Sequence, residues 1–170
     1  MAFANQPKGS VSTGSIKPVT RKAVRCQREV AWLVTQAAGK LVATTGDVNA
    51  PTPSFVLAAA LSYTRKQEQV AQDNGHAIDY EAVMSPDLAS FCQAAGLPAA
   101  PNALSDAGYM FTLSGADLIR DLYAYCSDLD ERMEDAAQVK PGYAIKLALR
   151  SFLLDAAAGN GATSADSASA

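Results

Sequence analysis

The side chains that most often carry out catalysis are sparse in this sequence. Its single histidine, His76, lies in a polar stretch and is typical of a solvated loop residue. The sequence contains neither a nucleophile-elbow motif nor a glycine-rich phosphate loop. We interpret the acidic run at residues 128–135 as a solvated helix face in which Asp128 pairs with Arg132. These patterns indicate a protein that is not an enzyme and predict no cofactor.

The cysteines do not form a recognisable metal or disulfide pattern. Cys26, Cys92 and Cys126 are odd in number, far apart and without the paired spacing that places two thiolates on one metal ion. We therefore predict no metal site, a reducing compartment, and burial of the three thiols as small apolar side chains.

Basic residues are concentrated near the start of the chain. Residues 1–40 contain seven Lys or Arg and one acid, whereas residues 101–170 contain ten acids and five bases, within a net charge of −3. Arg21, Lys22, Arg25 and Arg28 fall within eight residues. Such a group either contacts phosphates, with salt-sensitive affinity and no sequence specificity, or forms a solvated face that pairs with the acids of a neighbour. A polarised subunit of this kind suits binding and assembly.

The elements that must position these side chains read as helices. Helical spacing of apolar residues, N-cap residues and the punctuating Gly and Pro predict helices near residues 20–38, 53–72, 85–96, 114–133 and from residue 141 onward, with Ser85 and Ser114 as N-caps. The predicted apolar faces include Leu118, Leu122, Tyr125 and Leu129 in the fourth helix, and Ile145, Leu149 and Leu153 in the last. The fold class is therefore all-α, a single bundle of about five helices. We predict a flexible N-terminal arm at 1–19, a core domain at 20–158 and a flexible low-complexity tail at 159–170.

Hydropathy predicts no membrane partner. The longest apolar run, residues 55–61, is far shorter than the roughly 20 residues that span a bilayer. The first residues also lack the apolar stretch of a secretory signal.

Three short elements resemble coat proteins of flexuous filamentous plant RNA viruses, the potexvirus and potyvirus groups. The first is Asp-Asn-Gly at 73–75, after a helix. The second is Gly-Ala-Asp-Leu-Ile-Arg at 115–120, followed by two tyrosines. The third is Pro-Gly-Tyr at 141–143, leading to Lys-Leu-Ala at 146–148 and Ser-Phe-Leu-Leu-Asp at 151–155. The resemblance implies a capsid protein of a helical virion that assembles in the host cytoplasm.

The resemblance also implies RNA-contacting residues. In that family an arginine in the second element and an aspartate in the third line or buttress the RNA groove. Arg120 matches the arginine directly, and the aspartate falls on Ser151 or, with a shift of register, on Asp155. Together with the basic residues, the predicted RNA-binding set is Arg120, Arg21, Lys22, Arg25, Arg28, Lys146, Arg150, Ser151 and Asp155.

The sequence thus predicts a structural subunit that polymerises head-to-tail and packages single-stranded RNA by phosphate contacts. Its partners are other copies of itself and the RNA. One alternative is a bacteriophage virion or tail-assembly protein without nucleic acid. Another is a small helical adaptor that does not polymerise.

Overall fold

The computed structural model describes residues 19–46, 49–101, 108–133 and 138–169, with side chains described as far as residue 155. Residues 1–18, most of the predicted N-terminal arm, lie outside this set. The described chain is predominantly helical, as predicted, but it also contains a small sheet, so the all-α prediction needs correction. The elements are β1 (Arg21–Cys26), α2 (Glu29–Thr45), α3 (Pro53–Asp73), α4 (Tyr80–Met84), α5 (Leu88–Ala94), β2 (Tyr109–Ser114), α6 (Ala116–Arg132) and α7 (Pro141–Ser169).

The two strands form an antiparallel ribbon where a helix was expected. Val24 lies opposite Phe111, and the two side chains are buried. Alternate residues of both strands point into the core, as the two-residue period of a strand requires. The prediction of a helix over residues 20–38 is therefore wrong for β1, because pairing with β2 overrides the helix propensity of its residues. The helix begins at Glu29 instead.

Helices α3 and α5 begin with side-chain caps. The Thr52 side chain accepts a hydrogen bond from the backbone N–H of Phe55, and Pro53 occupies the first helical position. The predicted helix at 53–72 is confirmed. For α5 the cap is Asp87, whose carboxylate accepts from the N–H of Ser90 at 2.7 Å, rather than the predicted Ser85.

Helix α6 turns sharply from β2 through Gly115. This glycine has a φ of 113°, a conformation that side chains with a Cβ rarely adopt, and it replaces the predicted cap by Ser114. The predicted apolar face is confirmed, because four residues at helical spacing are buried: Leu118, Leu122, Tyr125 and Leu129.

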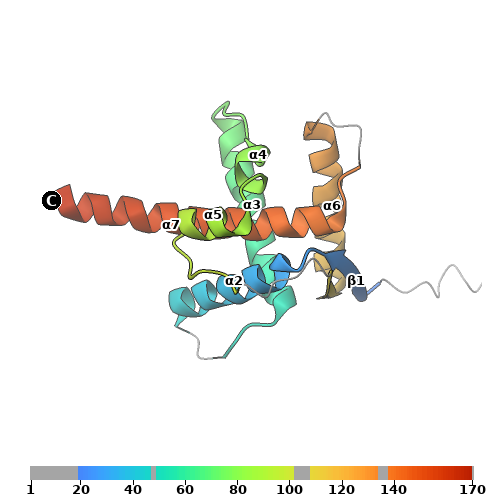
Figure 1. Ribbon diagram of the computed structural model, residues 1–170. Coiled ribbons are helices and arrows are strands. Elements are labelled where there is room, and N and C mark those ends of the chain that lie inside the picture. Colours follow the sequence, from blue (N-terminus) through green and yellow to red (C-terminus); the bar gives the residue numbers. More distant parts are fainter. Residues whose placement is uncertain (1–18, 47–48, 102–107, 134–137, 170) are drawn as a thin grey trace, which may run out of the picture.

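Helix α7 is the central element of the fold. It contacts α2, α3, α4, α6 and β1, and it crosses the whole molecule in Figure 1. Ile145, Leu149 and Leu153 are buried along it, as predicted. The helix continues to Ser169, through the segment where a flexible tail was predicted. No helix among the described residues is both long enough and apolar enough to cross a membrane.

The two ends of the described chain lie far apart. β1 is at one end of the body, next to the start of α7, and the C-terminal part of α7 projects beyond the other helices at the opposite end (Figure 1). A subunit built in this way has two distinct ends.

Candidate nucleic-acid interface

The four basic residues that the sequence analysis singled out near the start of the chain lie on a strand and on the turn that follows it. We call Arg21, Lys22, Arg25 and Arg28 the basic face, since all four residues are exposed. Arg21 and Arg25 are on the same side of β1, because side chains two and four residues apart in a strand share a face. Lys22 is on the other side, where its ammonium group lies 5.4 Å from the centre of the Tyr123 ring on α6. The four charges therefore spread around the edge of the ribbon instead of following a helix.

Arg120, which the viral resemblance proposes as an RNA contact, is also on the surface. Its side chain is 69% exposed on α6. The guanidinium pairs with Asp117 at 3.0 Å and with Asp121 at 3.2 Å, so neighbouring carboxylates offset its charge. Arg120 is accessible to a ligand, but its local surroundings are less positive than those of the basic face.

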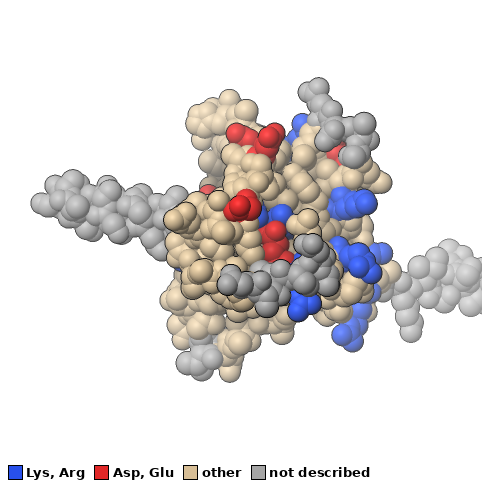
Figure 2. Space-filling view, in the orientation of Figure 1, with Lys and Arg blue, Asp and Glu red and all other residues tan. Residues whose placement is uncertain are grey.

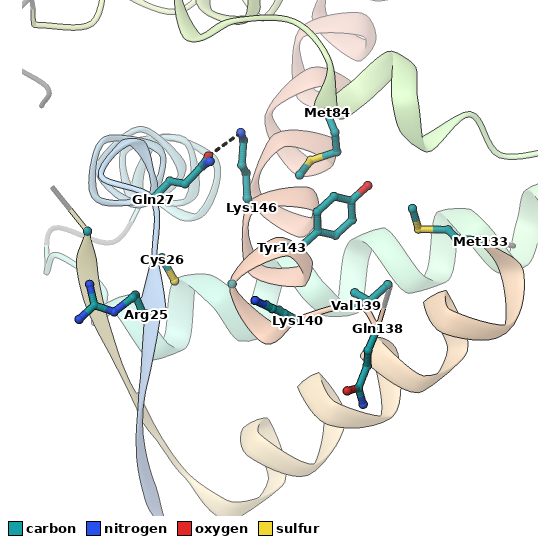
Figure 3. Close-up of a pocket in the computed structure, with 12 residues that line it drawn as sticks. Arg25, Cys26, Gln27, Met84, Met133, Gln138, Val139, Lys140, Tyr143 and Lys146 are labelled. Atoms are coloured by element: carbon teal, nitrogen blue, oxygen red, sulfur yellow. Dashed lines mark hydrogen bonds between the residues drawn. The ribbon is translucent and has the colours of Figure 1, made fainter. Parts of the chain in front are cut away.

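A pocket of about 690 Å³ lies between the end of β1 and the start of α7 (Figure 3). In the view of Figure 3, the Tyr143 ring lies between Met84 and Met133 on one side of the pocket. Gly142 allows α7 to approach β1 closely, because a Cβ at this position would lie 2.6 Å from the carbonyl oxygen of Arg25. The lining residues are Arg25, Cys26, Gln27, Met84, Gly108, Met133, Gln138, Val139, Lys140, Gly142, Tyr143 and Lys146.

The polar part of this lining is positively charged. Arg25, Lys140 and Lys146 come from three different segments, and none of the described lining residues is acidic. Cys26 adds no negative charge, because burial raises the pKa of its thiol to about 11. We call this cavity the basic pocket.

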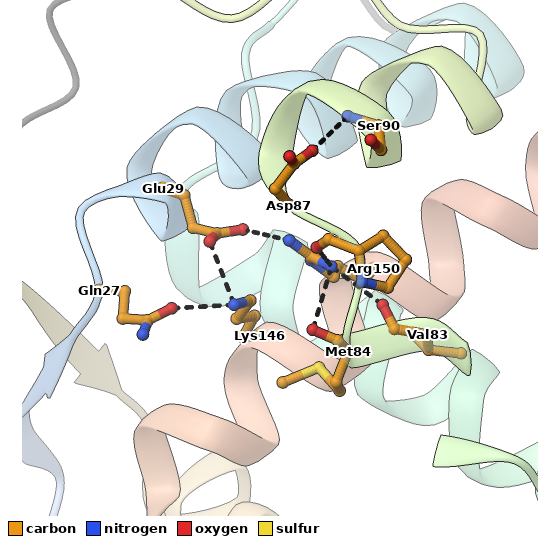
Figure 4. A network of polar contacts seen from close by, with 9 residues as sticks. Gln27, Glu29, Val83, Met84, Asp87, Ser90, Lys146 and Arg150 are labelled. Carbon is orange, nitrogen blue, oxygen red and sulfur yellow. Dashed lines mark hydrogen bonds and ion pairs between the residues drawn. The ribbon is translucent and has the colours of Figure 1, made fainter. Parts of the chain in front are cut away.

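Behind the basic pocket, two cations share one carboxylate (Figure 4). Lys146 lies 3.1 Å from one oxygen of Glu29, and Arg150 lies 2.9 Å from the other. The three side chains are 14%, 1% and 16% exposed for Lys146, Arg150 and Glu29. Lys146 also donates to the side-chain oxygen of Gln27 at 2.9 Å. The formal charge of this group, which we call the Glu29 triad, is +1.

Arg150 is therefore a core residue and not a surface cation. Its guanidinium donates to the carbonyl oxygens of Val83 at 3.0 Å and Pro86 at 2.8 Å, and lies 4.6 Å from the centre of the Phe91 ring. Its Nε has no hydrogen-bond partner among the described residues. Because protein groups surround Arg150, the prediction that it contacts RNA does not agree with its position. It joins α7 to the segment between α4 and α5.

Ser151 and Asp155 are separated from the basic residues. Both line a second cavity of about 260 Å³, between α3, α4 and α7, which also contains Glu68 and Asp79. Burial raises the pKa of the Asp155 carboxyl group. We call this cavity the acidic pocket. An acidic lining disfavours phosphate, so the two residues are not brought together with the predicted cationic contacts.

The buried carboxylate of the acidic pocket is already paired. Glu68 accepts hydrogen bonds from the Tyr125 hydroxyl and from Arg132, and Arg132 also donates to Tyr80 at 3.2 Å. Burial, followed by the hydrogen bond to Glu68, raises the pKa of Tyr125 strongly. The predicted pair of Asp128 with Arg132 is wrong, because Asp128 pairs with Arg65 of α3 instead.

The remaining candidates have the surroundings expected from the sequence. His76 is exposed. The prediction that Cys26, Cys92 and Cys126 are buried is confirmed. Lys140 and Tyr143 were missed as site residues, although the Pro-Gly-Tyr sequence that opens α7 marks a close approach of two segments.

On the face shown in Figure 2, side chains of opposite charge gather in different places. In the view of Figure 2, Lys and Arg gather over the end of the molecule that contains β1 and the start of α7, and Asp and Glu lie towards α4. This separation occurs in a chain whose net charge is −3.

Comparison with known proteins identifies no relative. No protein-family model, characterised protein or solved structure matches this chain. The resemblance to filamentous-virus coat proteins therefore stays a prediction.

Proposed function

We propose that this protein is a structural subunit of a helical filamentous virion, which polymerises head-to-tail and packages single-stranded RNA. The observation that carries the proposal is the basic face together with the basic pocket. The four exposed cations and the cationic cavity meet at Arg25, which belongs to both, in a subunit whose net charge is negative. Such a surface attracts phosphates locally without binding polyanions over the whole molecule.

The polarity of the subunit supports head-to-tail assembly. The cationic end contains β1, and the C-terminal part of α7 projects from the opposite end (Figure 1). A contact between two different surfaces that does not close into a ring generates a helical filament. RNA in such a filament is held mainly by backbone contacts, which need charge but no base-specific code.

The salt dependence of RNA binding tests the role of the basic face. We expect an Arg21→Gln/Arg28→Gln variant to bind labelled oligo(U) with a shallower slope of log affinity against log salt, by about 0.7 for each phosphate that the variant no longer neutralises. The matched control, Lys40→Gln/Lys66→Gln, removes two positive charges from α2 and α3 and leaves the basic face intact. An equal change of slope in both variants would show that net charge, and not this surface, controls binding.

A second candidate function is docking to another protein, as in a phage virion or tail-assembly component. It is favoured by large apolar side chains that are exposed close to the ribbon, Phe55 at 60% and Met110 at 51%. Under this alternative the basic face pairs with acids of a neighbouring subunit, and the purified protein assembles without nucleic acid. A small adaptor would stay monomeric or dimeric at every concentration.

A further inference from the structure

Among the described residues, the lining of the basic pocket carries more positive charge than the neighbouring carboxylates neutralise. Lys146 and Arg150 share the single carboxylate of Glu29 in surroundings that are largely closed to water. Arg25 and Lys140 add further cations to the lining, and the described lining contains no carboxylate. Cations withdrawn from water are costly unless an anion or several hydrogen bonds compensate them. The pocket is therefore suited to receive an anion.

Lys146 is the member of the Glu29 triad that a ligand can reach. It lines the pocket, whereas Arg150 is enclosed by carbonyl groups at the end of α4 and in the segment that follows it. The ammonium group of Lys146 is held in place by Glu29 and Gln27 (Figure 4). An anion that binds here meets a positioned cation and does not have to order a mobile one, which lowers the entropic cost of binding.

The size and the apolar wall of the pocket indicate more than a simple anion. Its volume of about 690 Å³ is in the usual range for sites that bind small organic ligands, about 300–1,000 Å³. Tyr143, Met84 and Met133 lie together on one side of it (Figure 3). Aromatic and methionine side chains pack well against flat rings. A ligand that matches both the cations and the apolar wall of the pocket carries a negative charge and a planar group.

We propose that the basic pocket binds one ribonucleotide unit, with its phosphate at Arg25, Lys140 and Lys146 and its base against Tyr143 and the two methionines. This inference deepens the proposed function. It rests on that function because, in the filament, the bound nucleotide is part of the packaged RNA. The pocket itself also binds a free nucleoside monophosphate. The basic face, which adjoins the pocket, then binds the neighbouring phosphates of the RNA.

Calorimetric titration of the full chain, dissociated into subunits and freed of any copurified RNA beforehand, with three probes tests this site. The probes are adenosine 5′-monophosphate, inorganic phosphate and adenosine. We expect the monophosphate to bind about tenfold or more tightly than either fragment, because it engages the cations and the apolar wall together. Lys140→Gln, at an exposed position, should weaken the monophosphate by roughly tenfold. The control Lys66→Gln should leave its affinity unchanged.

A second variant tests the position of the base. Tyr143→Leu should weaken the binding of adenosine 5′-monophosphate and leave the affinity for inorganic phosphate unchanged. Equal affinities for the monophosphate and inorganic phosphate would overturn the nucleotide assignment. No binding of any probe, or equal weakening by Lys140→Gln and Lys66→Gln, would overturn the site altogether.

The two proposals fail in distinguishable ways. If the Arg21→Gln/Arg28→Gln variant alters the salt slope for oligo(U) while no monophosphate binds, the basic face contacts RNA as proposed and the assignment of the pocket is wrong. If the monophosphate binds with the expected dependence on Lys140 while the slope does not change, the pocket assignment stands and the proposed path of the strand is wrong.

Discussion

The two pockets beside α7 differ in how their charges are balanced. In the acidic pocket, Glu68 is bound by Arg132 and by the Tyr125 hydroxyl, and the Asp79 carboxylate caps α4 by accepting from the N–H of Ala82 at 3.0 Å. Beside the basic pocket, Lys146 and Arg150 pair with one and the same carboxylate, that of Glu29. Among the described residues, Glu68 and Asp79 are each paired within the protein, whereas Lys146 and Arg150 together carry one positive charge more than Glu29 balances.

This difference separates a structural role from a binding role. A buried polar network whose members are all paired fixes the packing of helices and has little left to offer a ligand. A network with an uncompensated charge next to a cavity of about 690 Å³ gains free energy when a counter-charge enters. We therefore assign the acidic pocket to the stability of the bundle and the basic pocket to ligand binding.

The largest expected effect comes from removing the shared carboxylate. Glu29→Gln leaves two nearly buried cations, Lys146 and Arg150, without an anion, so we expect the free energy of unfolding to fall by about 3–5 kcal/mol. Glu68→Gln leaves one cation, Arg132, without its carboxylate and gives the Tyr125 hydroxyl a weaker acceptor. Because Arg132 is more exposed than Lys146 and Arg150, this variant should cost about 1–3 kcal/mol. Urea unfolding of both variants measures the difference. Equal losses would contradict the contrast between the two pockets.

A smaller effect is expected at the approach of β1 to α7. A Cβ at Gly142 would lie 2.6 Å from the carbonyl oxygen of Arg25, so Gly142→Ala should push the strand away and cost about 1–3 kcal/mol. Gly39→Ala, in the middle of α2 with nothing within 4 Å of the new Cβ, should instead stabilise the protein by about 0.5–1 kcal/mol. Thermal unfolding distinguishes the two signs. A stabilised Gly142→Ala variant would mean that the wall of the basic pocket is not formed as described.

The last effect concerns the cysteines on and off the basic pocket, and at neutral pH it is absent. Burial raises the pKa of both Cys26 and Cys126 from 9.0 to about 11, although only Cys26 lines the pocket. The unfolded chain ionises its thiols near pH 9, so the free energy of unfolding should be unaffected below pH 9 and fall between pH 9 and 11. Thiolate absorbance of Cys26→Ala and Cys126→Ala variants assigns each titration. If Cys26 is instead a thiolate at neutral pH, the positive charges of the pocket lower its pKa by more than burial raises it, which would contradict this prediction.

The long helices could be predicted from the sequence because their signals are local. Pro53 and Pro141 mark the starts of α3 and α7, and the apolar spacing of Leu118, Leu122 and Leu129 defines the buried face of α6. Each signal depends on residues within a few turns of one helix.

The ribbon could not be predicted in the same way, because its stability comes from distant residues. β1 and β2 are six residues each, and Val24 pairs with Phe111, which lies about half the chain away in the sequence. Short strands with charged residues carry little signal of their own, and their pairing is decided by the packing of both buried faces on the helices.

The candidate site was predictable only in part for a related reason. The charges at Arg21 and Arg25 were visible in the sequence, but Lys146 and Arg150 looked equivalent at a spacing of one helical turn. Only the fold brings the carbonyl groups between α4 and α5 around Arg150 and leaves Lys146 at the cavity. Glu29, the single acid among the first 40 residues, was the one available signal of a paired position.

Electron microscopy of the purified full chain, combined with its ratio of absorbance at 260 and 280 nm before and after ribonuclease treatment, tests the central claim most directly. We predict filaments whose absorbance ratio is typical of nucleic acid and stays the same after ribonuclease treatment, because the packaged RNA is protected. Filaments, rings or tubes with a protein-like ratio would contradict RNA packaging and favour the protein-docking alternative. Small particles at every concentration would contradict assembly itself.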